Sequence, residues 1–372
     1  MSVTEIPSYL LFVLYALAGI QVGYYLIVFI RLALHKPLET PLKKEDPVTI
    51  ILCARNEVEN LRQNLPLILE QDYRKFEVIV ANDNSSDETS DYLAELAQQY
   101  PNLKEVKYVE NEKYPKGKKF ILTLAIKAAK YDILLHTDAD CAPASNQWLR
   151  RMQQHFTPTS HIVLGYAPYE RSAGMLNRWV RYETFYTALQ YLSFALARMP
   201  YMGVGRNLSY RSSLFFAYKG FASHNHIMGG DDDLFVNETA TGTNTQIEIH
   251  PEAFTYSTSK KTWSEWWRQK SRHLSTGRYY KSKFKWLLGL LNVTHILTLA
   301  LGIALLCFHD TLIPAAAVLG FRTLVQYSVL GPVMKKLKCF SLWWGILFFD
   351  FMYVFYYIII GIKTLFRRNK RW

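Results

Sequence analysis

The chain carries long, nearly uncharged apolar runs close to both of its ends. The first covers Tyr9 to about Leu34, and two strong runs near the other end cover Trp286 to Phe308 and Phe340 to Leu365. As helices rising about 1.5 Å per residue, all are long enough to cross a hydrocarbon core about 30 Å thick. The first run is too long for a signal-peptide core, and no small-residue cleavage pattern follows it. The pattern predicts membrane-spanning helices at both ends.

The charges beside these runs bear on their orientation. The first run is followed by His35, Lys36, Lys43 and Lys44. Because Lys and Arg flanks tend to stay on the cytoplasmic side, we expect this flank and the domain after it in the cytoplasm.

The number of C-terminal spans stays open. A weaker apolar run, Thr311 to Met334, carries Arg322 in its middle. If all the C-terminal runs cross the membrane, the basic cluster at the chain end lies outside. If the weak run does not cross, the basic cluster that follows the weak run lies outside instead. Either count conflicts with the charge tendency. The two clusters are Arg367, Arg368, Lys370 and Arg371, and Lys335, Lys336 and Lys338.

Between Pro47 and about Tyr169, short apolar runs alternate with amphipathic stretches, which is typical of βαβ units with a parallel sheet. The predicted strands are Val48 to Ala54, Phe76 to Ala81, Leu103 to Val109, Asp132 to Thr137 and His161 to Tyr166. The predicted helices are Asn60 to Glu70, Ser86 to Tyr100, Lys118 to Lys130 and Asn146 to Phe156. The pattern Ser85-x-x-Glu88 predicts a capping box at the second helix. The aromatic-rich stretch Leu176 to Met199 fits either amphipathic helices at a membrane interface or a buried helix pair.

Composition agrees with apolar blocks beside an ordinary soluble domain, since hydrophobic residues are 50% and charged residues still 20% of the 372 residues. The net charge of +12 favours contact with anionic lipid, nucleic acid or phosphorylated substrates without choosing among them. The scattered cysteines form no short C-x-x-C pair, so we interpret them as reduced and structural. They are Cys53, Cys141, Cys307 and Cys339.

Carboxylates follow several of the predicted strands. Ligands of an open α/β sheet bind at the carboxyl ends of its strands, so these positions are where a site is expected. The segments are Ala54-Arg55-Asn56-Glu57, Asn82-Asp83-Asn84-Ser85-Ser86-Asp87 and Asp138-Ala139-Asp140. Each segment alone is also compatible with helix caps and turns, above all the Asn82 to Asp87 loop. Their repeated occurrence at one sheet edge favours a site.

Asp138 and Asp140 stand one residue apart at a strand end, and a loop there lets both carboxylates share a cation. Hard oxygen ligands suit Mg²⁺ or Mn²⁺, whose usual purpose in α/β enzymes is to hold nucleotide phosphates. The letters D-x-D are a weak pattern by themselves. The position at the strand end carries the prediction.

Two further segments carry candidate chemistry. Gly229-Gly230-Asp231-Asp232-Asp233-Leu234 is either a solvated acidic turn or a site whose crowded carboxylates supply a general base. The segment from Trp266 to His273 sets tryptophans among cations on a predicted helix. It fits anchoring at a membrane surface, and it fits equally the stacking of sugar rings and the binding of a diphosphate.

In this order the motifs resemble glycosyltransferase family 2, the group of cellulose, chitin and hyaluronan synthases and ceramide glucosyltransferase. The resemblance covers about Pro47 to Tyr280 with the flanking spans. It implies a GT-A-type α/β fold with a mixed, mainly parallel sheet and transmembrane helices at both ends. The expected parts are a transmembrane helix in 1–36, the catalytic domain in 46–240, acceptor-side helices in 241–285 and a transmembrane region in 286–372.

The resemblance also implies roles for individual residues. Asp140 and Asp138 match the metal ligands. Asp231 matches the catalytic base, because Leu234 fixes the register of the family's E-D-x-x-L, and Asp232 is a possible substitute since Gly230 replaces the glutamate. The residues expected to bind the nucleotide sugar are Ala54, Arg55, Asn56, Glu57, Asp83, Lys118, Asp138, Gln269 and Arg272. Those expected on the acceptor side are Gly205, Asn207, Trp267 and His273.

Gln269-x-x-Arg272 departs from the family's Q-x-x-R-W because His273 replaces the tryptophan, which weakens a claim of processive synthesis. The resemblance implies an inverting, membrane-bound transferase using a nucleotide-diphosphate sugar with Mg²⁺ or Mn²⁺. Its partners would be a lipid-linked or growing glycan acceptor and membrane lipids, with no nucleic acid, at a bacterial-type inner membrane. A sugar nucleotidyltransferase and a catalytically silent nucleotide-sugar-binding protein are the alternatives. The first normally has a glycine-rich loop near the first strand, which Ala54 to Glu57 lacks.

Overall fold

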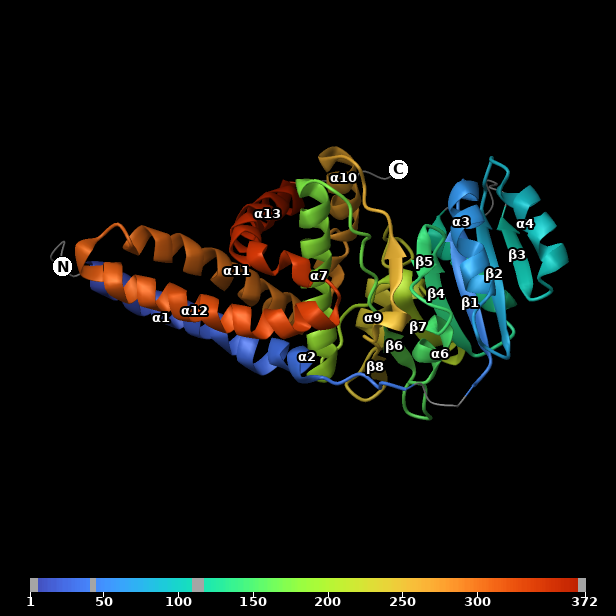
Figure 1. Ribbon diagram of the computed structural model, residues 1–372, viewed down its shortest axis with the longest axis horizontal. Helices are drawn as coiled ribbons and strands as arrows, with labels where there is room; N and C mark the ends of the chain where they lie inside the picture. Colours follow the sequence, from blue (N-terminus) through green and yellow to red (C-terminus); the bar gives the residue numbers. More distant parts are fainter. Residues whose placement is uncertain (1–5, 41–44, 109–116, 367–372) are drawn as a thin grey trace. The chain divides into compact units, whose positions relative to one another are not determined.

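The computed structural model describes residues 6–40, 45–108 and 117–366. These residues form two compact units: one consists of the described residues between 36 and 279, and the other of those up to 35 together with those from 280 onward. The expected flank at Lys43 and Lys44, the strand end at Val109 and the cluster from Arg367 to Arg371 lie outside the described residues. The first unit is an α/β domain and the second consists of long helices (Figure 1).

The α/β unit is built on one sheet of seven strands in the order β3-β2-β1-β4-β7-β6-β8. Strands β1, β2, β3 and β4 are parallel neighbours, and β7 runs antiparallel between β4 and β6. The strands are β1 (Val48–Ala54), β2 (Phe76–Asp83), β3 (Leu103–Tyr108), β4 (Ile133–Asp138), β6 (Ile162–Leu164), β7 (Leu208–Arg211) and β8 (Thr245–Ile247). A separate ribbon pairs β5 (Cys141–Pro143) with β9 (Thr255–Ser257). The sheet is therefore mixed and mainly parallel, as expected.

The helices of this unit cover the sheet and flank its carboxyl edge. They are α3 (Val58–Leu69), α4 (Thr89–Gln99), α5 (Lys118–Ala128), α6 (Trp148–Gln153), α7 (Met175–Leu196), α8 (Ser212–Ala217), α9 (Asp233–Thr239) and α10 (Trp263–His273). Alternate residues of β1, such as Val48, Ile50 and Leu52, pack in one core with α3, α4 and α6. Burial of both faces explains why the parallel strands are continuous apolar runs.

Some sequence predictions for this unit were wrong in detail. The capping box expected at Ser85 and Glu88 does not form: α4 begins at Thr89, whose backbone N–H donates to Asp87 Oδ1 at 3.1 Å. Between the two alternatives for Leu176 to Met199, the structure shows a single helix, α7, with most of its residues buried. Its Glu183 forms an ion pair of 2.5 Å with Lys270 of α10.

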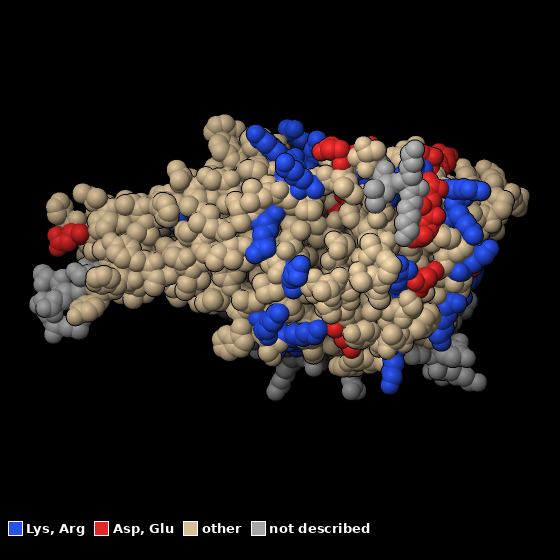
Figure 2. All heavy atoms as spheres, turned by 90° about the horizontal axis from the view of Figure 1, so that it is seen from below, with Lys and Arg blue, Asp and Glu red and all other residues tan. Residues whose placement is uncertain are grey.

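The helical unit contains α1 (Ile6–Gly23), a π-helical stretch (Tyr24–Phe29), α2 (Ile30–Leu34), α11 (Ser282–Leu305), α12 (His309–Lys336) and α13 (Ile346–Phe366). Four helical segments are long and apolar enough to span a membrane, and the weak run around Arg322 is one of them. In Figure 2 few Lys, Arg, Asp or Glu side chains colour the surface of the long helices. Such a surface suits lipid contact.

Arg322 is 1% exposed, and buried polar groups of neighbouring helices surround it. Its Nη1 donates to Asp350 Oδ2 of α13 at 2.6 Å, and its Nη2 contacts His295 Nδ1 of α11 at 3.0 Å. Gln326 Nε2 donates to Asp350 Oδ1 at 2.7 Å. The charge that weakened the apolar run is thus paired inside the helical unit, which is how ionisable residues are accommodated in membrane helices.

Candidate active site

The carboxyl ends of β1, β2 and β4 form the edge where the sequence predicted a site. In the strand register Cys53 stands opposite both Ala81 and Asp138, and Ala54 stands opposite Asn82. Because these strands are parallel and adjacent, the loops after them meet at one edge. A pocket opens here, lined among others by Cys53, Lys118, Asp138, Asp231 and Asp232.

The first two loops are joined by hydrogen bonds. Asn56, at φ 55°, accepts from the backbone N–H of Ser86 at 2.8 Å and donates its own N–H to Ser85 Oγ at 3.0 Å. Asp87 accepts from the N–H of Val58 at 3.2 Å, so part of the Asn82 to Asp87 loop does cap helices. Asp83 remains half-buried at the strand end, with Arg55 Nη1 3.8 Å from its Oδ2.

Lys118 connects the two acidic segments of the pocket. It opens α5 directly after Gly117, whose φ of 115° favours glycine. Its Nζ lies 2.9 Å from Asp138 Oδ1 and 3.2 Å from Asp231 Oδ2. The structure thereby brings together three residues of which the first and the last stand more than a hundred positions apart in sequence.

The acidic segment after Gly230 is a helix start and not a free turn. Gly230 has φ 81°, and a Cβ there would lie 2.5 Å from Leu234, so the glutamate of the family pattern has no room. Asp232 caps α9 by accepting from the N–H of Asp233 at 2.7 Å, and its Oδ2 accepts from the N–H of Gly205 at 2.8 Å. Asp233 is buried and accepts from the hydroxyl of Thr276.

Asp231 and Asp232 differ in charge state because their surroundings differ. Burial acts to raise the pKa of Asp231, but the ammonium of Lys118 outweighs it and holds that pKa below its usual value. Burial and the charge of Asp231 raise the pKa of Asp232 to about 7. Asp231 is therefore the ionised member of the pair near neutral pH. Both carboxylate oxygens of Asp232 accept hydrogen bonds from backbone N–H groups.

The carboxylate oxygens of Asp138 and Asp140 are the hard ligands that a divalent cation prefers. Asp140 is half-buried, and burial followed by the Asp138 charge raises its pKa, as expected of carboxylates placed to share a cation. Glu57 feels both charges as well, after burial, and its pKa is raised. In the part of the chain that the structure describes, no three His, Cys, Asp or Glu side chains already converge as ligands, so phosphate oxygens and water would complete the coordination.

The pocket's remaining ionisable groups are neutral. Burial, ahead of the neighbouring charges, raises the pKa of Cys53 to about 12, so the thiol is not a nucleophile. Burial and Lys118 lower the pKa of His136 to about 3. The imidazole of His136 stacks on Tyr210 with ring centroids 4.5 Å apart.

Two of the residues expected on the acceptor side, Gly205 and Asn207, have different surroundings in the structure. Gly205 contacts Asp232 as described, but Asn207 is 0% exposed and its amide is fully engaged: it donates to the carbonyls of Tyr166 and Ala253 and accepts from Trp148 Nε1. That burial does not fit the acceptor contact expected of Asn207. Its geometry is that of a residue that fixes the loop.

Helix α10 presents the Gln269-x-x-Arg272 segment. A capping box of Thr262 and Glu265 starts the helix, and buried Trp266 packs on Trp179 of α7 with centroids 6.0 Å apart. Trp267 and Gln269 are half-buried, whereas Arg272 and His273 are exposed. Thr276, just beyond α10, donates its hydroxyl to Asp233, which relates the end of α10 to the acidic segment of the pocket.

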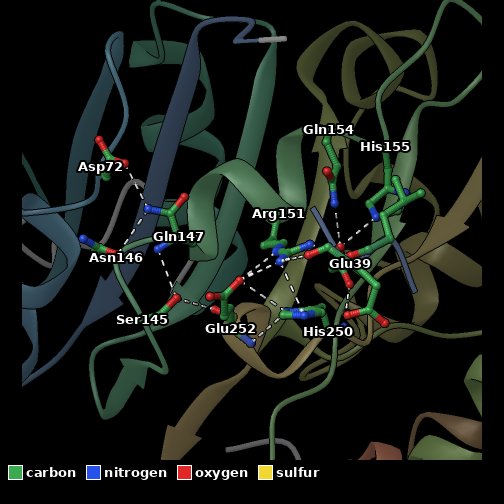
Figure 3. A network of polar contacts seen from close by, with 12 residues as sticks. Glu39, Asp72, Ser145, Asn146, Gln147, Arg151, Gln154, His155, His250 and Glu252 are labelled. Carbon is green, nitrogen blue, oxygen red and sulfur yellow. Dashed lines mark hydrogen bonds and ion pairs between the residues drawn. The ribbon is translucent and has the colours of Figure 1, made fainter. Parts of the chain in front are cut away.

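A polar network supports the ribbon beside the D-x-D segment (Figure 3). Arg151, 2% exposed, donates through Nη2 to Glu252 Oε2 at 2.7 Å and to the carbonyl of Glu39 at 2.7 Å. Ser145 Oγ donates to the carbonyl of Glu252 at 3.0 Å. The network thus fixes the segment that leads into β9, the partner of β5 directly after Asp140.

Comparison with known proteins agrees with this geometry. Residues 49–223 match the family model of glycosyl transferase family 2. The chain is 26% identical over 254 residues to the probable glycosyltransferase YdaM of Bacillus subtilis, covering 65% of this chain and 58% of that relative. It is 30% identical over 120 residues to the poly-beta-1,6-N-acetyl-D-glucosamine synthase of Staphylococcus aureus (strain COL), covering 32% of this chain and 28% of the synthase. The chain thus spans less than two thirds of these relatives.

Among solved structures, the mannosyltransferase PcManGT from Pyrobaculum calidifontis, in complex with GDP-Man and Mn²⁺, aligns with a TM-score of 0.60. The identity is 21%, and the alignment covers 97% of this chain and 100% of that one, which shows a shared fold. The α/β unit of this chain thus matches glycosyltransferase family 2 over residues 49–223.

Sequence reasoning missed two features of this site. It did not assign a role to Arg206, which stands between Gly205 and Asn207 in the sequence. It also missed β5 and β9, because strands of three residues leave no alternation to read.

Proposed function

We propose that this chain is a membrane-anchored, inverting glycosyltransferase that moves a sugar from a nucleotide diphosphate to a lipid-linked or growing glycan acceptor. The observation that carries the proposal is the bridge from Lys118 to both Asp138 and Asp231, which puts the expected metal ligand and the expected base in one pocket. The match of residues 49–223 to the family model supports the reaction class. The donor named for PcManGT and the polymer named for the synthase support a nucleotide sugar and a glycan, without selecting the sugar.

In this proposal each residue has a chemical task. Asp138 and Asp140 would hold Mg²⁺ or Mn²⁺, an ion that supplies positive charge to the oxygens of the leaving diphosphate. Asp231 accepts the proton of the acceptor hydroxyl, since it is ionised near neutral pH. Asp232 positions the loop of Gly205, and Asp83 with the first loop contacts the nucleoside.

The order of bonds is a single displacement. The acceptor oxygen forms a bond to the anomeric carbon as the bond from that carbon to the diphosphate oxygen breaks. The acceptor's proton moves to Asp231, and the electron pair leaves with the diphosphate. Lys118 Nζ lies 3.2 Å from Asp231 Oδ2, so its charge keeps the Asp231 carboxylate ionised before the reaction.

We further propose that the α/β unit faces the cytoplasm, because cations gather at one end of the helical unit. Tyr24 donates to the carbonyl of Leu287 at 2.7 Å, and Lys336 Nζ donates to the carbonyls of Leu32 and His35. These contacts place the end of α2, the start of α11 and the end of α12 together. The cations of that end are Arg31, Lys283, Lys285, Lys335, Lys336 and Lys338.

The connection between α11 and α12 lies at the opposite end, and residues 296–321 around it contain no Lys or Arg. Leu14, Leu305 and Ala315 pack together there, so α1, α11 and α12 run side by side. The chain leaves the helical unit near His35 and returns near Tyr280, both at the cationic end. By the positive-inside tendency that end belongs in the cytoplasm.

The proposal is tested with the purified full-length chain, its native membranes as acceptor source and a panel of UDP- and GDP-sugars with Mn²⁺, Mg²⁺ or chelator. We expect metal-dependent transfer from one donor. Asp231→Asn should lose at least about a thousandfold in turnover, in the upper range of a missing proton acceptor, with nucleotide binding nearly unchanged. Asp140→Ala should weaken nucleotide binding and its metal dependence together.

The matched control is Asp132→Asn, a carboxylate at the other end of β4 that pairs with Arg211. It should leave turnover unchanged. Wild-type turnover in Asp231→Asn would show that another group is the base. Formation of a sugar nucleotide in place of a glycan would favour the nucleotidyltransferase alternative, and nucleotide binding without any transfer would favour the silent one.

A further inference from the structure

Arg206 lies where the D-x-D segment, the β5–β9 ribbon and the base loop meet. It belongs to a short 3-10 turn, Gly205–Asn207, that precedes β7. Its carbonyl accepts from Thr137 Oγ1 at 3.0 Å and from Thr255 Oγ1 at 2.9 Å. The backbone of this residue is therefore fixed from two sides, next to a site that needs positive charge.

The guanidinium of Arg206 is held by neutral groups. It lies over the ring of Tyr169 at 4.4 Å, and its Nη1 donates to Ser257 Oγ at 2.5 Å. Within the described ranges 6–40, 45–108 and 117–366 no carboxylate forms an ion pair with it, although its charge acts on Asp140 and Asp138. An arginine placed for packing alone would gain from a carboxylate partner, because an uncompensated charge is costly to bury.

Arg211 of the same strand-and-turn segment shows the contrast. Its guanidinium also lies over an aromatic ring, that of Phe156 at 5.4 Å, but its Nη1 pairs with Asp132 Oδ2 at 3.0 Å. It stands opposite Ile133, the first residue of β4, so it lies at the far end of the sheet from Asp138. The charge of Arg211 is neutralised by Asp132 within the protein. The charge of Arg206 has a fixed position and is available to bind an anion.

We infer that Arg206 binds the terminal phosphate of the leaving nucleoside diphosphate beside the D-x-D segment. This rests on the proposed function. A guanidinium presents N–H groups in a planar fork that matches phosphate oxygens, and one hydrogen bond to Ser257 leaves most of that fork for a ligand. Tyr169 and Ser257 serve as positioning residues that hold the fork without neutralising it.

The test is calorimetric binding to the full-length protein of nucleotides that carry no sugar: UDP, UMP, GDP and GMP, each with Mn²⁺. Only the diphosphates contain the phosphate that Arg206 would contact. For Arg206→Gln we expect a loss of about 10- to 100-fold in affinity for the diphosphate, the size of one lost charge-assisted contact, and no comparable loss for the monophosphate. Arg206→Lys, which keeps the charge without the fork, should fall between.

Two further variants sharpen the result. Arg211→Gln is the matched control and should leave the affinities for both nucleotides unchanged. Ser257→Ala removes the hydroxyl that orients the guanidinium, so it should weaken diphosphate binding in the same selective way but less. Thermal unfolding of each variant without nucleotide establishes that the fold is retained.

The outcomes separate the inference from the function on which it rests. Equal losses for diphosphate and monophosphate, or no loss in Arg206→Gln, overturn the role of Arg206 and leave the transferase proposal standing. A carboxylate on the transferred sugar would attract the same guanidinium. If Arg206 bound that carboxylate, Arg206→Gln would not lower the affinity for these sugar-free nucleotides. The expected result therefore also excludes a sugar carboxylate as the ligand of Arg206. A wild-type protein that binds no nucleoside diphosphate overturns both proposals.

Discussion

At the scale of single residues, the neighbours of a carboxylate determine whether it serves structure or chemistry. Asp231 has a cation beside it and lines the pocket, whereas Asp232 accepts two backbone N–H groups and Asp233 the hydroxyl of Thr276. The three are adjacent in sequence and have different tasks. The sequence could therefore predict an acidic site and favour Asp231 as the base by its spacing to Leu234. Only the folded loop shows that Asp232 and Asp233 accept hydrogen bonds that fix the loop.

Glu248 offers a prediction at this scale because it is 2% exposed and titrates apart from the pocket. Burial acts to raise its pKa, but His155 at 2.9 Å, the backbone N–H of His250 and the amide of Gln154 outweigh it, so the pKa is lowered. A lowered pKa stabilises the fold at every pH above the unfolded-state value of about 4.5, and that contribution is lost as pH falls through the folded-state value.

We therefore expect Glu248→Gln to unfold at a lower temperature than wild type at neutral pH, with the difference shrinking below about pH 4.5. The measurement is thermal unfolding of the detergent-solubilised chain across pH 3 to 8, a range that includes the ordinary Glu pKa of about 4.5. Glu95→Gln, on the exposed face of α4, is the control and should shift little. A wild-type advantage that persists or grows in acid would contradict the assignment.

At the scale of elements, the bounds of a strand were predicted more accurately where its apolar run was longer. Strand β1 (Val48–Ala54) was predicted with its observed bounds and carries an unbroken apolar run, while the expected strand from His161 to Tyr166 shortened to Ile162–Leu164. The antiparallel β7 after Asn207 went unpredicted because its four residues pair with distant β4 and β6. Pairing across such separations is tertiary information that no local pattern contains.

The charge inside α12 is the element-scale feature most open to test. Arg322 and Asp350 join α12 to α13, both nearly unexposed. Arg322→Met leaves Asp350 without its cation, so we expect the solubilised protein to lose about 3–5 kcal/mol of stability. Arg322→Met with Asp350→Leu removes both charges and should regain more than half of that loss. Denaturant unfolding in detergent measures the cycle; a double variant no more stable than Arg322→Met would mean that the pair is not what joins these helices.

At the scale of the whole molecule, the chain's division into two units explains what sequence could and could not give. The apolar runs predicted the spans, and the motif order predicted the family, since each depends on residues near in sequence. Whether the helix around Arg322 belongs with the other spans depended on Asp350 and His295, which only folding brings to it. The open count of C-terminal spans was thus a question about packing, beyond the charge tendency alone.

The proposed orientation has a native reporter in Cys307, an exposed thiol between α11 and α12 at the end of the helical unit remote from the cations. If the α/β unit is cytoplasmic, this thiol faces the outside. A membrane-impermeant maleimide should then label wild-type chain in intact spheroplasts, and Cys307→Ser should abolish the label. Cys141 and Cys339 are buried and Cys53 is half-buried in the pocket, so they should contribute little background.

The converse control places a thiol on the α/β unit: Ala217→Cys, at an exposed position of α8, in the Cys307→Ser background. It should be labelled only after the membrane is permeabilised. If the Ala217→Cys variant were labelled in intact cells and Cys307 of the wild-type chain were not, the proposed orientation would be wrong. The pocket would then lie outside. A cytoplasmic nucleotide sugar could not then reach Asp138 and Asp231, so this experiment tests the supply of the donor as directly as it tests the topology.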